Sequence, residues 1–304
     1  MYEDTKNALK RLSENCLLVA VRVGVAGQTY TSSRASNDAA MVNNADANRL
    51  KTQVLKFTNS DLKPVRKERD DAKALLNAVT SPWDSNGNRL IQVKTYQNIR
   101  ERLDNHRARF YDLRDEFVSS YEAHKQKARE QLEDLYDDDR FPPAEEIRNQ
   151  FYFDIEKNVI TDADHICIEG TAATVEAIRD ELNQRHVRKL NDANQELIDR
   201  MKSQLRKSQA SIQRLHDKKQ AGEDTRFYDS TITGICSLVD TLDDININKD
   251  PELTEFGNSI ARVFDGLAIN QLKESPTLRE EVLEETDALV SAIESYTPNA
   301  FKSV

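Results

Sequence analysis

The chain has 304 residues, of which 38% are hydrophobic and 32% charged, and it contains only 8 glycines and 7 prolines. Long stretches without helix breakers favour an elongated helical protein over a compact α/β enzyme, whose many turns would need more glycine. No run approaches the ~20 apolar residues that span a bilayer, and the longest apolar stretch, residues 16–21, is too short for the core of a signal peptide. We therefore expect no contact with a membrane and a cytoplasmic location.

The net charge of −10 is divided unevenly along the sequence. Residues 1–129 carry 23 Lys and Arg against 16 Asp and Glu, and residues 185–219 carry 10 against 4. The segments 130–184 and 220–304 are acidic, with 4 basic against 16 acidic residues and 6 against 17. Antiparallel pairing of helices from these segments would place basic beside acidic residues where their registers allow it.

A strand and several helices are predicted in the first domain, residues 1–93. Valines at alternate positions of residues 19–25 are typical of a strand. Residues 37–79 are helix-forming, with Pro64 as a break or restart, and residues 81–88 form a loop with a tight Asn-Gly turn. Trp83, the only tryptophan, is predicted to pack in that loop against a helix end.

The clearest periodicity lies in residues 94–138, which are predicted to form one long helix of about 45 residues. Residues recur there at spacings that alternate mainly between three and four, which is the seam of a coiled coil. The seam residues are Tyr96, Ile99, Leu103, His106, Phe110, Leu113, Phe117, Ser120 and His124. Such a helix would be ~65 Å long, so we expect an elongated molecule.

A second long helix is predicted over residues 171–220, capped by Thr171 or Thr174 and ended by Gly222. Its apolar stripe is looser than the first seam and requires a partner on one face. We predict that the two long helices form an antiparallel coiled-coil hairpin within a domain that spans residues 94–220.

Two strands are predicted around the turn at residues 158–164, as a β-hairpin inserted near residues 151–169. With the valine strand they would make a small three-stranded antiparallel patch, since a hairpin alone is marginally stable. Residues 221–304 are predicted to form an acidic C-terminal bundle of short helices, near residues 226–244, 251–273 and 276–296. The predicted fold class is therefore mainly α with a small antiparallel β patch.

The sequence contains no P-loop, no Gly-x-Gly-x-x-Gly after a strand, no Gly-x-Ser-x-Gly and no His-Glu-x-x-His. We expect no enzymatic activity and no cofactor. Three widely spaced cysteines predict neither a disulfide framework nor a zinc knuckle. Asp162, Asp164, His165 and Cys167 come closest to a metal site, but no second ligand pair closes it, so a plain strand and turn is favoured. The acidic run Asp137–Asp139 is predicted to be solvated.

Basic residues are concentrated on the second long helix. Spacings near i+3 and i+4 make a stripe that could meet phosphates, but the favoured interpretation is a solvated coiled-coil face paired with the acids of a neighbouring helix. The absence of aromatic residues between positions 187 and 226 argues against base stacking. The candidate nucleic-acid-binding residues are Arg185, Arg188, Lys189, Lys202, Arg206, Lys207, Lys218 and Lys219.

A family resemblance rests on two short segments, FPPAEEIRNQFYFD at residues 141–154 and VITDAD at residues 159–164. They resemble the central motif of an uncharacterised family of tailed-phage and integrative-element proteins, with an aromatic-Pro helix and a Phe-x-Phe strand. Genes of this family are often found near MoxR-type AAA ATPases and von Willebrand A-domain proteins, so the resemblance implies an adaptor or an assembly partner. The aromatic residue usual after the first strand is not obvious here, where Val25-Ala26-Gly27 stands.

The leading hypothesis is a non-enzymatic phage or mobile-element structural and interaction protein, in the cytoplasm of an infected bacterial host. It would act by coiled-coil assembly as a homo-oligomer, or as an adaptor for a protein partner such as an AAA ATPase. The alternative is a nucleic-acid-binding protein of phage replication or recombination that uses the basic helix 185–219. The oligomeric state is open, because a heptad seam can be satisfied within one chain or between chains.

Overall fold

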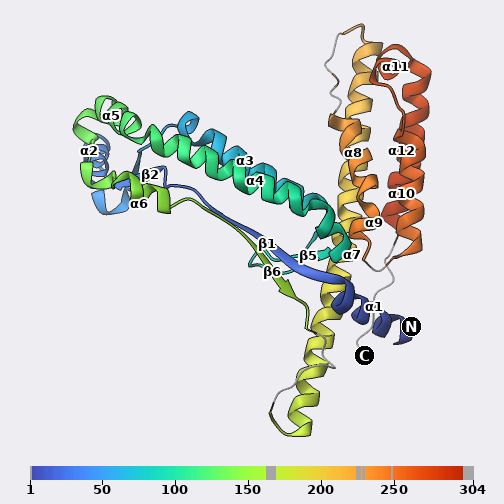
Figure 1. Cartoon of the computed structure of the whole chain (residues 1–304). Helices are drawn as coiled ribbons and strands as arrows, with labels where there is room; N and C mark the ends of the chain where they lie inside the picture. The colour runs from blue at the N-terminus through green and yellow to red at the C-terminus, as the bar shows by residue number, and fades with distance from the viewer. Residues whose placement is uncertain (1, 162–168, 224–226, 228–229, 248, 297–304) are drawn as a thin grey trace. The chain divides into compact units, whose positions relative to one another are not determined.

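A computed structural model of the chain describes residues 2–161, 169–223, 227, 230–247 and 249–296. Over these residues the chain is mainly helical with a small antiparallel sheet, which confirms the coarse fold class (Figure 1). None of the helices in the described ranges combines the length and the apolar character that crossing a bilayer requires.

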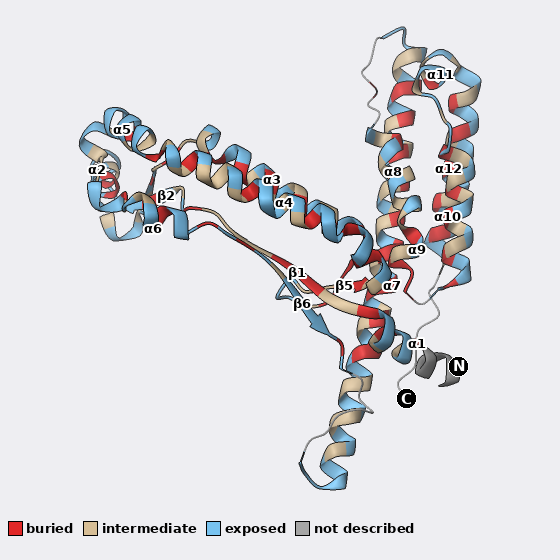
Figure 2. Ribbon diagram, viewed as in Figure 1, coloured by how far each residue is buried: buried red, intermediate tan, exposed pale blue. Residues whose placement is uncertain are grey.

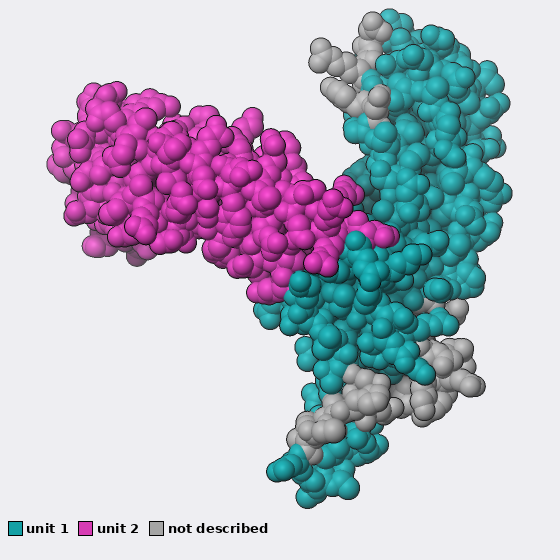
Figure 3. Space-filling model, viewed as in Figure 1, with its two compact units in different colours: residues 1–19, 77–97, 157–304 teal, residues 20–76, 98–156 magenta. Residues whose placement is uncertain are grey.

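The chain forms two compact units, each assembled from separate stretches of sequence (Figure 3). Unit 1 contains Met1–Val19, Asn77–Gln97 and Lys157–Val304, and unit 2 contains Ala20–Leu76 and Asn98–Glu156. The predicted domains are consecutive segments with boundaries after residues 93 and 220, whereas each unit combines separate stretches. The domain boundaries therefore stay a prediction.

The sheet is centred on β1 (Cys16–Gly24), which contains most of the predicted valine strand. β5 (Arg89–Gln92) pairs antiparallel with β1, and Cys16 lies opposite Gln92. The two-residue strand β4 (Ser81–Pro82) pairs antiparallel with β5. Neither β4 nor β5 was predicted, because strands of two and four residues are too short to show a period of two.

β6 (Tyr152–Val159) completes this sheet, whose strand order is β4-β5-β1-β6. The first strand of the predicted hairpin near residues 151–169 is therefore confirmed. The second strand of the predicted hairpin, residues 165–169, falls almost entirely outside the described residues.

α7 (Ala172–Gln220) is a single helix of 49 residues, as predicted. Thr171 is its N-cap: the side chain accepts a hydrogen bond from the backbone N–H of Thr174, one of the donors that the first turn leaves free. After the helix, Gly222 has a φ of +74°, a left-handed conformation that glycine adopts without strain.

Further helices follow α7 and pack with it into the main core of unit 1 (Figure 2). They are α8 (Ser230–Asp240), α9 (Leu242–Ile245), α10 (Pro251–Phe264), α11 (Ile269–Glu274) and α12 (Pro276–Ser295). Both α12 and α8 lie along α7. The positions of the three predicted C-terminal helices are confirmed, but α9 and α11 are separate short helices.

A buried polar junction fixes the start of α10. The Asp250 carboxylate accepts a hydrogen bond from the backbone N–H of Glu252 at 2.9 Å, and the Tyr296 hydroxyl donates to it at 2.6 Å. The Asn246 side chain both donates to the Asp250 carbonyl and accepts from the Asp250 N–H, each at 2.9 Å. Burial, together with the bond to the Asp250 carboxylate, raises the pKa of Tyr296, so its hydroxyl stays protonated as a donor.

In unit 2, the prediction of helix over residues 37–79 with a break or restart at Pro64 is wrong, because the helix is interrupted earlier and Pro64 lies inside a later helix. α2 (Ser33–Asn43) ends at Asn44, whose φ of 50° is left-handed. β3 (Thr52–Leu55) follows and pairs antiparallel with β2 (Thr29–Ser32) before α3 (Asn59–Ala78) begins. Asn tolerates the left-handed conformation that stops a helix, and this local effect overrides the apolar spacing.

The predicted long helix at residues 94–138 is also wrong, because the structure contains two helices, α4 (Val93–Ser119) and α5 (Tyr121–Leu132). The Ser120 hydroxyl between them donates to the backbone carbonyl of Glu116 at 3.0 Å. Such side-chain bonds to the preceding turn compete with the main-chain pattern and bend helices.

The seam residues of α4 that are buried within unit 2 are Ile99, Leu103, Phe110 and Phe117. The Phe110 ring lies 5.5 Å from that of Phe153, and the Phe117 ring lies 5.2 Å from that of Phe57. Leu103 is fully buried. The seam therefore has partners inside its own unit, and the predicted hairpin of the two long helices stays a prediction.

Replacing Asp250 with Ala is expected to lower the free energy of unfolding by about 1–3 kcal/mol, because the change removes the cap of α10 and the acceptor of Tyr296. Urea unfolding followed by circular dichroism measures the loss. The matched control is Glu255→Ala on the exposed face of the same helix, expected within about 1 kcal/mol of the original chain. Equal stability of the two variants would contradict this role of Asp250.

Candidate functional site

The candidate nucleic-acid-binding residues all lie on α7, where they are spread along the helix. From residue 185 to residue 219 the axial distance is roughly 50 Å. Arg185, Arg188, Arg206 and Lys207 are exposed, and Lys189, Lys202, Lys218 and Lys219 are half-buried. They form a stripe along α7, and the residues that neighbour it differ from one part of the helix to the next.

Acidic residues of α12 occupy one part of this stripe. The Arg206 Nε donates to Glu294 Oε1 at 3.1 Å, and Gln209 donates to Asp287 at 3.0 Å. Other basic groups pair locally: Lys189 lies 3.7 Å from Asp192, and Lys218 lies 3.6 Å from Glu223. For Arg206, the expectation of pairing with the acids of a neighbouring helix is confirmed.

Three of the candidate residues also line a groove on the surface of α7. Lys202, Arg206 and Lys207 line it together with Asp199, Ser203 and Ala210. All of its walls come from one helix, and the cations outnumber the single carboxylate. The groove can therefore contact phosphate groups, but it has no aromatic or second-element wall that would recognise a base.

Arg200, in the same basic stretch, has a structural role. Its guanidinium donates to the backbone carbonyls of Asn77 at 3.0 Å and Thr80 at 2.7 Å. It also pairs with Glu196 on α7 at 2.5 Å. These bonds attach α7 to the segment that leads into β4, so Arg200 is not available to a ligand.

The N-terminal end of α7 differs from the rest of the helix. Residues 172–185 contain no buried residue, whereas 13 buried residues lie between His186 and His216. Val175, Ile178 and Leu182 are half-buried and lie at spacings of three and four, so they form one apolar stripe on this end. The sequence predicted a stripe along the whole helix but not this difference in burial.

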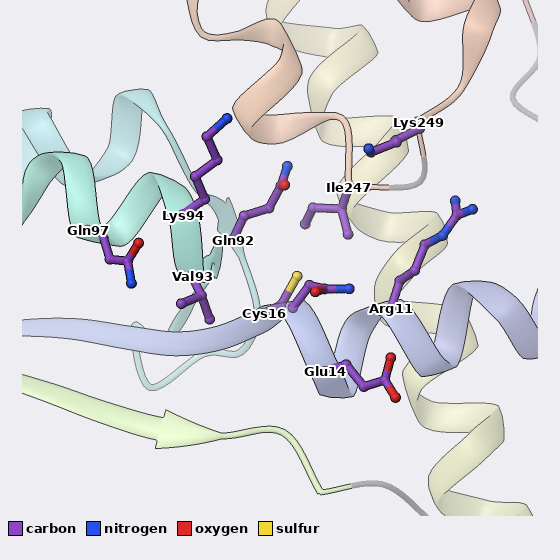
Figure 4. Close-up of a pocket in the computed structure, with 10 residues that line it drawn as sticks. Arg11, Glu14, Cys16, Gln92, Val93, Lys94, Gln97, Ile247 and Lys249 are labelled. Atoms are coloured by element: carbon purple, nitrogen blue, oxygen red, sulfur yellow. The ribbon is translucent and has the colours of Figure 1, made fainter.

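A cavity of about 510 Å³ lies in unit 1 (Figure 4). Its three basic side chains come from three segments: Arg11 from α1 (Tyr2–Asn15), Lys94 from the first turn of α4, and Lys249 from the loop before α10. The other lining residues are Glu14, Asn15, Cys16, Gln92, Val93, Gln97 and Ile247. Sequence reasoning missed this group because isolated basic residues in segments far apart carry no motif.

Hydrogen bonds hold one wall of the cavity. The Gln92 side-chain amide donates to the backbone carbonyls of Asp243 at 2.9 Å and Asp244 at 3.0 Å. The Thr95 hydroxyl donates to the Asp244 carboxylate at 2.6 Å. The end of β5 and the first turn of α4 are thereby fixed to α9.

Cys16 lies in the wall of this cavity as a small apolar group. It is buried, and burial raises its pKa to about 12. Because the thiolate is the reactive form, this thiol is a poor nucleophile near neutral pH. The cavity therefore resembles a binding site more than a centre of thiol chemistry.

The weak metal candidate of the sequence, Asp162, Asp164, His165 and Cys167, lies outside the described residues. Within the described ranges, no group of three or more His, Cys, Asp and Glu side chains is placed to hold a metal ion. Asp138, in the acidic run, pairs with Lys125 at 3.0 Å, so this carboxylate has a partner in the chain.

Two histidine–carboxylate pairs in unit 2 join α3 to the helices that follow it. His106 Nδ1 lies 2.5 Å from Glu68 Oε1, and Arg109 Nε lies 3.3 Å from the other oxygen of Glu68. His124 Nδ1 lies 3.6 Å from Asp61. Both histidines belong to the predicted seam, and here they satisfy the largely buried carboxylates of α3, which is a structural role.

Comparison of the chain with protein-family models, with curated proteins and with solved structures finds no match. The resemblance to a tailed-phage protein family therefore stays an expectation.

We expect Cys16 to resist a thiol reagent such as N-ethylmaleimide in the native protein at pH 7.5 and to react once the chain is unfolded in urea, because its buried thiol stays protonated. Peptide mapping by mass spectrometry measures labelling at Cys16, with half-buried Cys236 as the internal reference. Native labelling of Cys16 as fast as that of Cys236 would contradict the account of the cavity wall.

Proposed function

We propose that the chain is a non-enzymatic interaction protein that assembles with a second copy of itself through the N-terminal end of α7. The observation that carries the proposal is the half-buried stripe of Val175, Ile178 and Leu182 on residues 172–185, a segment without a buried residue. An amphipathic end of a long helix is stabilised when its stripe packs against another helix.

The charges beside the stripe favour a second copy as the partner. The turns with Glu176, Asp180 and Glu181 are acidic, with Arg179 as their one basic residue, and the next turns carry the basic group Arg185, Arg188 and Lys189. An antiparallel pair centred near Leu182 would place the acidic turns of each copy beside the basic turns of the other. Three apolar residues per copy form a short seam, so the assembly would be weak and dependent on concentration.

In this proposal, the coiled-coil contact expected from the sequence forms between two α7 helices of two copies. The burial of the α4 seam within unit 2 supports this reading, since that seam already packs against aromatic residues such as Phe57 and Phe153. The alternative is the hairpin predicted from the sequence, in which the seams of the two long helices pair within one chain.

The resemblance to tailed-phage and integrative-element proteins supports a structural or adaptor role. An AAA ATPase, which the gene neighbourhood of that family implies, is a candidate partner for the assembled protein. Under this proposal the protein would work in the cytoplasm of an infected bacterial host.

Self-association is expected to raise the mass in solution from that of the 34.8 kDa chain toward twice that value as the protein concentration increases through the micromolar range. The variant Ile178→Asp/Leu182→Asp should stay monomeric, because it places charges in the seam. Light scattering coupled to size-exclusion chromatography measures both.

The matched control is Ala177→Asp/Gln184→Asp, which adds the same charge on exposed positions of the same turns. It should associate much more strongly than the seam variant. A monomeric original chain at every concentration, or equal association of the two variants, would rule out the α7 interface.

Nucleic-acid binding is the second candidate function, favoured by the groove lined by Lys202, Arg206 and Lys207. Exposed Arg185 and Arg188 extend the positive charge toward the start of the helix. The pairing of Arg206 with Glu294 weakens this candidate, because a carboxylate beside the groove repels phosphates.

If α7 binds nucleic acid, affinity for duplex DNA should fall steeply with added salt, and Arg188→Glu/Lys202→Glu/Lys207→Glu should abolish binding. Fluorescence anisotropy with a labelled duplex measures this, and Lys51→Glu/Lys63→Glu/Arg100→Glu is the control with the same change in charge. No binding by the original chain at low salt, or the same loss in both variants, would remove this function.

A further inference from the structure

We propose that the cavity lined by Arg11, Lys94 and Lys249 binds a small molecule that carries phosphate groups. Its volume of about 510 Å³ lies in the range of small-molecule sites. Three cations from three separate segments line one concave surface, which is how proteins commonly hold phosphate esters. This inference does not depend on self-association through α7.

The positive charge of the cavity is not neutralised by the described part of the chain. No ion pair within that part involves Arg11, Lys94 or Lys249. Glu14 is the only acidic lining residue, and its carboxylate lies 3.8 Å from Lys10, which does not line the cavity. In a chain of net charge −10, this leaves three cations against one carboxylate around a small volume. An anion bound there would gain favourable charge contacts with these cations.

Two of the three cations, Lys94 and Lys249, stand on segments that hydrogen bonds hold in place within unit 1. The first turn of α4, which carries Lys94, contains no acidic residue and is fixed through Gln92 to α9. Lys249 has a left-handed φ of 51°, and the buried Asn246 braces its loop through two hydrogen bonds to Asp250. A preformed arrangement lowers the entropy that a ligand would otherwise lose on binding.

The rest of the lining indicates the other part of the ligand. Asn15 and Gln97 supply amide donors and acceptors, and the Cys16 thiol, Val93 and Ile247 supply an apolar surface. In Figure 4, Lys249 lies at the upper edge, Arg11 toward the right and Glu14 below. A nucleotide fits this lining better than a bare inorganic ion does. Its phosphates would contact the cations, and its polar ring system would lie against the amides and the apolar residues.

Isothermal titration calorimetry at constant ionic strength tests the site with three probes: ATP, inorganic pyrophosphate and adenosine. We expect binding of ATP, weaker binding of pyrophosphate and none of adenosine, because the phosphates supply the charge contacts. The variant Arg11→Gln/Lys94→Gln/Lys249→Asn should weaken ATP binding by about tenfold or more. Asn is chosen at position 249 because it tolerates the left-handed backbone.

The control variant is Lys51→Gln/Lys63→Gln/Arg100→Gln, which removes three exposed cations of unit 2 that line neither the cavity nor the α7 groove. It should bind ATP as the original chain does, and thermal melts of both variants should match that chain. If a melt shows that the triple cavity variant is unfolded, single replacements at Arg11 and Lys94 each have to weaken binding. Absence of ATP and pyrophosphate binding up to millimolar concentration, or equal loss in the cavity variant and the unit 2 control, would overturn the proposal.

Discussion

Unit 1 depends on the burial of one face of α7 between His186 and His216. Leu190, Leu197 and Ile198 there are fully removed from water, and each buried side chain of this size contributes about 1.5–3 kcal/mol. α12 and α8 lie along this stretch, so most of the C-terminal half of the chain takes its position from it. A helix of 49 residues has little stability of its own in water without such a packed face.

Buried polar contacts then fix the positions of the helix ends, which apolar packing alone does not determine. Arg279 of α12 donates to the carbonyls of Leu272 and Lys273 at the end of α11, which satisfies groups that every helix end leaves free. Asn246 and Asp250 do the same between α9 and α10. The loop that carries Lys249 into the proposed phosphate site is held by this second junction, so stability and binding share a structural element.

The sequence was informative where a long periodic pattern had clear ends. α7 was predicted almost to the residue because Thr171 caps it and Gly222 follows it, and α12 because Pro276 begins it. The break at Ser120 was missed, since one serine bonded to the preceding turn leaves the apolar spacing of α4 and α5 unchanged. The strands β2, β3, β4 and β5 have four residues or fewer, which is too short for any periodic signal.

The candidate sites were predictable only in part, because they depend on how distant segments pack together. A run of basic residues on one helix is visible in a sequence, but the placement of Glu294 beside Arg206 depends on how α12 packs. The cavity brings together residues 11, 94 and 249, whose proximity follows from the pairing of β1 with β5 and from the loop after α9. Such a site becomes visible only when the tertiary structure is known.

In the proposed assembly, α7 combines two stretches: residues 186–216, which are buried on one face and organise unit 1, and the N-terminal residues 172–185, which a second copy stabilises. Hydrogen–deuterium exchange measured by mass spectrometry at several protein concentrations tests it directly. Peptides from residues 186–216 should be strongly protected at every concentration, while those from residues 172–185 should exchange quickly in dilute protein and become protected as the concentration rises. Protection of residues 172–185 that is the same at all concentrations, whether high or low, would contradict the account.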